Sequence, residues 1–459
     1  MSRGATVPET ATAIVTANRA GRLTPAETIA RSYARLRSYA DPAMFITVRE
    51  EREAVAEARS LNDNTLPLFG VPVAVKDNID VAGMPTTAAC PAFTYMARRD
   101  ATVVERLRAA GAIIIGKTNL DQFATGLNGT RSPYGIPRNA IKPELIPGGS
   151  SSGSAVAVAA GIVPLALGTD TAGSGRVPAG LNNIIGLKPS LGLISTDGVV
   201  PACRTLDCVS VFALTVEDAW VALATISGHD NRDPYSRKRP LGTPGPMPKL
   251  RLGVPHSDQR LFFGDSQFEA AYVDALASLA RLGHMISEID IEPFFETARL
   301  LYEGPWVAER AIVARPVLDS DPRALHPVTR EIIVSGLKPT AMDAFAAFYK
   351  LEELRRIADR TFTEVDALAV PTAPSAYTVG QLLNDPIQLN SRLGTYTNFV
   401  NLLDLCGLAL PAAFTKDGIP FGITLLAPGG GDALLASLGS AFEADTKLPL
   451  GALKKAQPA

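Results

Sequence analysis

The alternation of apolar and polar positions changes character near Leu66, where short β-branched runs begin to alternate with helical stretches. The apolar runs predict buried strands, and the amphipathic or alanine-rich stretches between them predict helices. We expect strands at Val71–Val75, Ala112–Ile115 and Ile162–Leu167, and helices at Val103–Ala110 and Ser152–Ala160. This order predicts an α/β fold: one large domain with a mixed, mostly parallel β-sheet covered by helices on both faces.

The regions on either side of this core have patterns of their own. Residues 9–60 read as helices, and Thr24 with Glu27 forms a capping box that opens a helix reaching about Tyr39. Residues 230–248 are rich in Pro, Arg and Asp and predict an extended connection. Beyond it we expect a strand at Leu250–Val254, a helix at Gln267–Leu282 capped by Asp265 or Ser266, and a strand at Met285–Ile291.

We therefore expect two regions in a single domain. Residues 1–60 form N-terminal helices that pack on the core, and residues 61–459 form the main domain, with a catalytic core at 66–215. We see no repeat of fixed period, and we expect no additional C-terminal domain.

Composition and charge limit the partners and the cellular compartment that we expect for this protein. The 459 residues are 46% hydrophobic with a formal net charge of −2, so charge gives no case for nucleic acid or an anionic membrane. The longest apolar run, Ala155–Gly168, is shorter than the ~20 residues that a spanning helix needs. The first residues lack the basic-then-apolar pattern of a secretory signal. Four scattered cysteines (Cys90, Cys203, Cys208 and Cys406) indicate structural thiols in a reduced, cytoplasmic setting.

One motif points to a different function. The segment Gly111–Thr118 matches the phosphate-loop pattern and would make the chain a nucleotide-binding protein. A phosphate loop must curl so that its N–H groups converge on an anion, whereas the residues between these glycines are alanine and three isoleucines. Those residues favour a buried strand, so we interpret the segment as a strand that ends in a turn.

The residues with candidate chemistry are one lysine and two serines. Lys76 ends an apolar run, and Ser150 and Ser174 lie 24 residues apart in Gly-Ser-rich stretches. A serine nucleophile needs a base, and none of the four histidines lies in these stretches. Lysine can serve only when neutral; lowering its pKa from about 10.4 to near 7 costs about 4 kcal/mol, within reach of burial. Ser150 would then relay the proton from Ser174 to Lys76.

The turn before Ser174 supplies the second requirement of acyl transfer. Thr171, Ala172, Gly173 and Ser174 bring small side chains together, so their N–H groups can approach a substrate carbonyl and hold an oxyanion. Asp170 and Arg176 flank this turn, and we expect an ion pair that braces it.

These elements resemble the amidase signature family, closely over residues 66 to about 215 and more loosely to the end of the chain. The family pattern has a strand-end lysine, a Gly-Gly-Ser-Ser-Gly-Gly loop and a Gly-Thr-Asp-x-Gly-Gly-Ser-Ile-Arg turn. Lys76 matches the base, Ser150 the relay serine that follows a cis peptide bond, and Ser174 the nucleophile. Ser152, Ala172 and Gly175 depart from the common pattern, and these departures resemble the allophanate hydrolase branch.

The resemblance to this branch implies a small anionic ureido substrate, allophanate (urea-1-carboxylate), cleaved with release of ammonia. Tyr302 and Arg310 match the branch's carboxylate-binding residues, although Gly304 and Pro305 interrupt the helix between them. Without the resemblance, Arg310 would be interpreted as a surface or salt-bridged arginine. The resemblance implies no metal and no organic cofactor, a homodimer for which the N-terminal helices are a candidate contact, and a link to a urea carboxylase or to a cyanuric-acid or biuret pathway.

Three other functions stay open from the sequence. The chain could be another amidase of the same family, acting on small aliphatic amides or as the glutaminase subunit of a tRNA amidotransferase. It could bind a nucleotide through Gly111–Thr118, or it could be a scaffold without activity.

Overall fold

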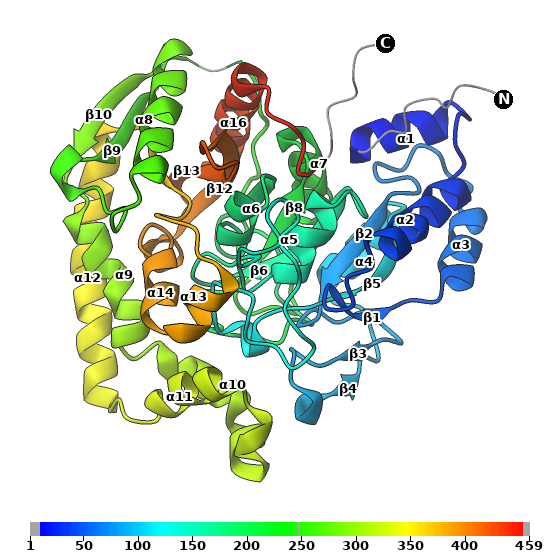
Figure 1. The fold of residues 1–459 in the computed structure, drawn as a ribbon, viewed down its shortest axis with the longest axis horizontal. Helices are drawn as coiled ribbons and strands as arrows, with labels where there is room; N and C mark the ends of the chain where they lie inside the picture. The colour runs from blue at the N-terminus through cyan, green and yellow to red at the C-terminus, as the bar shows by residue number, and fades with distance from the viewer. Residues whose placement is uncertain (1–9, 247, 453–459) are drawn as a thin grey trace.

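The computed structural model describes residues 10–246 and 248–452, which form an α/β fold around a mixed sheet of eleven strands (Figure 1). The parts of the predictions that concern residues 1–9, 247 and 453–459 lie outside the described residues. Along the sheet the order is β1 (Phe45–Val48), β5 (Ile113–Thr118), β2 (Pro72–Lys76), β6 (Leu165–Asp170), β8 (Cys208–Ala213), β7 (Ile185–Lys188), β12 (Leu405–Phe414), β13 (Pro420–Pro428), β11 (Ala367–Pro371), β9 (Arg251–Pro255) and β10 (Met285–Ile289). A separate pair joins β3 (Pro85–Thr86) and β4 (Tyr95–Met96).

Helices cover both faces of the large sheet, as the sequence predicts. Successive strand residues point to opposite faces; in β5, Ile114 enters one core cluster while Ile113 and Ile115 enter another. The first face packs against α1 (Ala11–Arg19), α4 (Thr102–Ala109), α7 (Val216–Ile226), α8 (Ser266–Arg281) and α16 (Asp432–Thr446). The opposite face packs against α2 (Pro25–Tyr39), α3 (Glu51–Ser60) and α5 (Ser152–Ala159) in one half, and α9 (Glu292–Glu303), α12 (Ala341–Glu364) and α15 (Phe399–Leu402) in the other.

The predicted dominance of parallel pairing is wrong, although the mixed sheet is confirmed. Parallel pairs join β2 to β5 and β6, and β9 to β10 and β11. The other six neighbouring pairs of the described sheet are antiparallel. Long strands such as β12 and β13 form a hairpin, and a two-strand hairpin is antiparallel by construction.

Most predicted elements appear with small shifts, but the prediction that residues 9–60 are helical is wrong at Phe45–Val48, which forms the edge strand β1 and pairs with β5. The capping box of Thr24 and Glu27 opens α2, and Asp265 caps α8. The strand predicted at Ile162–Leu167 instead begins at Leu165 and continues to Asp170, because Gly161 (φ +68°) turns the chain after α5 and residues 162–164 complete that turn. All four cysteines are buried and free.

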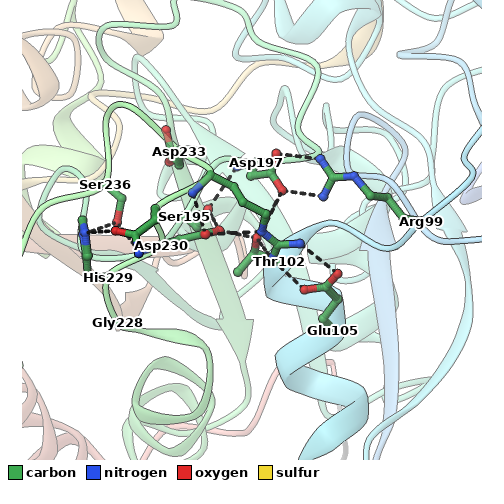
Figure 2. A network of polar contacts seen from close by, with 12 residues as sticks. Arg99, Thr102, Glu105, Ser195, Asp197, Gly228, His229, Asp230, Asp233 and Ser236 are labelled. Atoms are coloured by element: carbon green, nitrogen blue, oxygen red, sulfur yellow. Dashed lines mark hydrogen bonds and ion pairs between the residues drawn. The ribbon is translucent and has the colours of Figure 1, made fainter.

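The extended connection after α7 is anchored by polar contacts. Between Ile226 and Arg251 the described residues form neither helix nor strand. Asp230, near the start of this connection, accepts hydrogen bonds from Thr102 Oγ1 at 2.5 Å and Ser195 Oγ at 2.8 Å (Figure 2). These bonds fasten the connection to α4 and to the turn at 195–197.

Further helices complete the fold near the residues of interest: α6 (Val177–Leu181), α10 (Val307–Ser320), α11 (Pro327–Ser335), α13 (Val379–Asn384) and α14 (Gln388–Leu393). Figure 1 shows α10 and α11 at the lower end of the view, below α9 and α12. No helix among the described residues is long and apolar enough to span a bilayer.

Candidate active site

Lys76 is the last residue of β2, which lies between β5 and β6 within the sheet. Its side chain is fully buried. Nζ lies 2.7 Å from Ser150 Oγ and 2.7 Å from Thr169 Oγ1 and donates to both. The structure thus brings together the predicted base and relay serine. It adds Thr169 of β6, which the sequence pattern did not single out although it immediately precedes Asp170 in the chain.

Burial has a large effect on the protonation of Lys76. Loss of hydration lowers the pKa of Lys76 to about 7, even though the carboxylates of Asp121 and Asp170 act in the opposite direction. A lysine with this pKa is neutral in a substantial fraction of molecules near pH 7. It can therefore accept a proton, which an ordinary surface lysine cannot do.

The loop that carries Ser150 is built on close backbone packing, with a cis peptide bond between Gly149 and Ser150. A Cβ on Gly149 would lie 2.1 Å from Asp121 Oδ2, and one on Gly148 would lie 2.6 Å from Pro178 Cα. Neither position has room for a side chain. The Gly-Gly pair is therefore what allows Ser150 to reach Lys76.

The turn that carries Ser174 connects β6 to α6 and is held from within by one carboxylate. Asp170 accepts two hydrogen bonds of 2.9 Å from the Arg176 guanidinium, and both side chains are fully buried. The same carboxylate accepts the N–H groups of Gly173 and Gly175, each at 2.9 Å. The predicted ion pair of Asp170 and Arg176 is confirmed, and it fixes the backbone on both sides of Ser174.

The four backbone N–H groups predicted to hold an oxyanion are not equivalent in the structure. Because Gly173 donates its N–H to Asp170, that group is already occupied. The N–H groups of Thr171, Ala172 and Ser174 have no protein acceptor within residues 10–246 and 248–452. These three remain available to a substrate carbonyl.

The nucleophile and the relay do not make direct contact. Ser174 is buried, with 3% of its surface exposed. No hydrogen bond joins the hydroxyls of Ser150 and Ser174 in the described chain, whereas Lys76 and Ser150 are in direct contact.

A segment from the second half of the chain braces the nucleophile turn. Thr397 Oγ1 donates to Ala172 O at 2.7 Å, and Asn401 Nδ2 donates to Asp170 O at 2.9 Å. Arg176 also donates to Thr397 O at 3.2 Å. The sequence pattern gave no signal for these contacts, because they join positions more than 200 residues apart.

Tyr302 and Arg310 converge despite the interruption between them. Tyr302 lies near the end of α9, Arg310 lies in α10, and the break at Gly304 and Pro305 separates the two helices. Arg310 Nη2 donates to Tyr302 Oη at 3.3 Å, and the guanidinium lies 5.3 Å from the centre of the tyrosine ring. Arg310 is 2% exposed, which excludes its interpretation as a surface arginine.

The segment that matched the phosphate-loop pattern is a strand. Residues 113–118 form β5, and every residue in that strand is buried. Lys117 Nζ lies 3.1 Å from Asp77 Oδ1 and donates to Pro85 O at 3.1 Å. With its lysine engaged inside the protein, the segment does not form a phosphate cradle.

The fold and this arrangement of lysine, serines and glycine-rich turns define the class of protein. The sequence profile of the amidase family, described as "Amidase", matches residues 27–436, and the chain belongs to this family.

Individual relatives narrow the comparison. The chain is 50% identical to urea amidolyase of Saccharomyces cerevisiae over 388 residues, which cover 83% of this chain and 21% of that protein. Kluyveromyces lactis allophanate hydrolase has a similar structure, with a TM-score of 0.90 and 43% identity over 96% of this chain and 74% of that one. A glutamyl-tRNA(Gln) amidotransferase subunit of Symbiobacterium thermophilum is 37% identical, covering 93% of this chain and 95% of that protein. The chain thus spans about a fifth of the urea amidolyases it matches.

Proposed function

We propose that this chain hydrolyses allophanate at its terminal amide and releases ammonia. The observation that carries the proposal is the contact between buried Arg310 and half-buried Tyr302, added to an amidase-family core with a low-pKa lysine. The similarity to Kluyveromyces lactis allophanate hydrolase supports the choice of substrate.

The pair is suited to a carboxylate. Arg310 carries a positive charge, is fully buried, and forms no ion pair with a carboxylate in the described residues. Its Nε is also without a hydrogen-bond partner there. Arginine binds carboxylates through two parallel hydrogen bonds, and the Tyr302 hydroxyl offers another donor. A substrate carboxylate at this position would offset the cost of the buried charge.

The proposed reaction begins with neutral Lys76. Lys76 Nζ takes the proton of Ser150 Oγ while Ser150 takes the proton of Ser174, and Ser174 Oγ attacks the carbonyl carbon of the terminal amide. The free N–H groups of Thr171, Ala172 and Ser174 stabilise the resulting oxyanion; one such donor typically contributes about 10² to 10³ in rate.

The intermediate then collapses with cleavage of the carbon–nitrogen bond. The proton held on Lys76 returns through Ser150 to the departing nitrogen, which leaves as ammonia. Water, deprotonated by the same relay, attacks the acyl-enzyme on Ser174 and releases N-carboxycarbamate.

A glutaminase subunit of a tRNA amidotransferase is the second candidate. It is favoured by the similarity to the Symbiobacterium thermophilum protein, nearly all of which aligns with this chain. Glutamine also carries a carboxylate, but beside an ammonium group that allophanate lacks. Activity on small aliphatic amides would use the same serines and lysine without Arg310.

Substitution of Arg310 tests the choice of substrate. Biuret is a matched control because it replaces the carboxylate of allophanate with a neutral amide. Arg310→Ala is expected to raise KM for allophanate at least tenfold and to leave kcat/KM for biuret within twofold. Arg310→Lys should recover part of the loss. Unchanged allophanate kinetics in Arg310→Ala would contradict the proposed carboxylate site.

Two further proposals accompany this function. We expect an enzyme that carboxylates urea, or one of a cyanuric-acid or biuret pathway, to supply the substrate. We also expect a homodimer with the N-terminal helices as a contact, which sedimentation of the purified chain and of a variant altered in α2 would test.

A further inference from the structure

Three arginines are among the largest fully buried side chains of the protein: Arg131, Arg176 and Arg310. Arg176 is neutralised by its ion pair with Asp170. Neither Arg131 nor Arg310 forms an ion pair with a carboxylate in the described part of the chain. A buried charge without an opposite partner is costly, so two such residues call for a physical reason.

Arg131 and Arg310 meet at one residue. Arg131 Nη1 donates to Thr125 O at 2.9 Å, and Arg310 Nη1 donates to Thr125 Oγ1 at 3.1 Å. The two guanidinium groups thus approach Thr125 from segments that lie far apart in the sequence. Burial lowers the pKa of Arg131, and the positive charge of Arg310 contributes to the same direction.

None of the remaining hydrogen bonds of Arg131 is to a carboxylate that would neutralise its charge. Nη2 donates to Pro386 O at 2.7 Å, and Nε has no hydrogen-bond partner among the described residues. The carboxylate of Asp121, which acts on Arg131 through its charge, is bound to backbone N–H groups, including those of Gly129 and Arg131 itself. The carbonyl oxygens that accept from Arg131 carry only partial negative charges. They therefore do not cancel the positive charge of the guanidinium, which can act on other groups nearby.

We infer that Arg131 is a second cation of the carboxylate site, which with Arg310 selects substrates that carry a negative charge. The inference rests on the proposed function and extends its carboxylate site by one residue. Arg131 is a positioning and specificity residue: it acts on the substrate through its charge, while Arg310 and Tyr302 supply the direct hydrogen bonds. Tyr302 Oη accepts a hydrogen bond from Arg310 Nη2 at 3.3 Å, and Arg310 and Arg131 both donate to Thr125, so the three side chains belong to one connected set of contacts.

A purely structural role for Arg131 makes a different prediction. If the side chain serves only to hold the carbonyls of Thr125 and Pro386, its loss should weaken every substrate equally. If its charge acts on the substrate, the loss should depend on the charge of the substrate and should be recovered by another cation. Coulomb interactions in a buried site are strong enough to make this difference measurable.

The test measures binding directly, so that it does not depend on turnover. In a Ser174→Ala background, calorimetry gives the Kd of allophanate and of biuret for the protein with Arg131 intact and for Arg131→Gln and Arg131→Lys. We expect Arg131→Gln to raise the Kd of allophanate at least tenfold and that of biuret less than twofold, and Arg131→Lys to recover most of the loss. Thermal unfolding checks that each variant is folded; should Arg131→Gln be unstable, Arg131→Met replaces it.

The outcomes separate this inference from the proposed function. An unchanged Kd of allophanate in Arg131→Gln, or an equal loss in Arg131→Gln and Arg131→Lys, would overturn the role of the second charge. If the Ser174→Ala protein with intact Arg131 binds biuret more tightly than allophanate, the carboxylate site itself is wrong and the proposed function fails with it.

Discussion

Lys76 Nζ lies 2.7 Å from Ser150 Oγ, and both side chains are fully buried inside the sheet and its loops. Burial lowers the pKa of the lysine to about 7. The contact therefore joins a base that can be neutral at physiological pH to a hydroxyl that can pass a proton. A histidine is not needed for this chemistry.

The first prediction concerns the pH dependence of activity. Lys76 accepts a proton only when neutral, so kcat/KM should fall as pH drops through about 7 and reach a plateau above about pH 8. The pKa of Asp207, raised by burial to about 6, lies nearby, and Thr171 Oγ1 donates to it. Measurement of kcat/KM from about pH 5.5 to about pH 9 for wild type and Asp207→Asn separates the two groups. If the fall of kcat/KM at low pH disappears in Asp207→Asn, the group that titrates is Asp207 and not Lys76.

The second prediction orders the losses along the relay. Lys76→Met removes the base but keeps a buried side chain of similar length, and should lower kcat by about 10³ or more. Ser150→Ala should lower it less, by about 10², because a water can partly replace the hydroxyl. Single-turnover kinetics on allophanate would measure both. A larger loss in Ser150→Ala than in Lys76→Met would contradict the order of proton transfer.

The third prediction tests the ion pair that holds the nucleophile turn. Asp170→Asn leaves the Arg176 charge buried without a partner, which typically costs about 3–5 kcal/mol in the free energy of unfolding. Urea denaturation measures that loss. The double variant Asp170→Asn, Arg176→Met removes the stranded charge and should be more stable than Asp170→Asn alone. If it is not, the destabilisation comes from the lost hydrogen bonds to Gly173 and Gly175.

The fourth prediction explains why a glycine follows the nucleophile. A Cβ on Gly175 would lie 2.5 Å from Ser210 Cβ, so Gly175→Ala should cost about 1–3 kcal/mol through overpacking. Ser210→Gly removes the obstructing atoms, and Ser210 Oγ has no hydrogen-bond partner to lose in the described structure. The Tm of Gly175→Ala should therefore rise when Ser210→Gly is added. Equal Tm values for the single and double variants would show that contact with Ser210 is not the cause.

The sequence predicted those parts of the fold that depend on local pattern. The strand ending at Lys76 and the helix capped by Thr24 follow from short-range periodicity and hydrogen bonding, and they appear as expected. The start of β6 was misplaced because a turn at Gly161 converts apolar residues into loop. The excess of antiparallel pairs was missed because the order of strands in a sheet depends on contacts between distant segments.

The candidate site divides in the same way. Lys76, Ser150 and Ser174 stand in recognisable motifs, and the convergence of Tyr302 with Arg310 was expected only from resemblance. Thr169 also lies in one of these motifs, but nothing in the sequence distinguishes it as a partner of Lys76. Arg131 and Thr397 lie outside the helices and strands, and contacts with distant segments bury them.

The most direct test of the account is ammonia release from allophanate, with glutamine and propionamide assayed in parallel, by the wild-type chain and Ser174→Ala. We predict that the wild type turns over allophanate with the highest kcat/KM and that Ser174→Ala loses this activity while its Tm is nearly unchanged. Faster turnover of glutamine or propionamide, or allophanate hydrolysis that survives in Ser174→Ala, would contradict the proposed substrate or the proposed nucleophile, respectively.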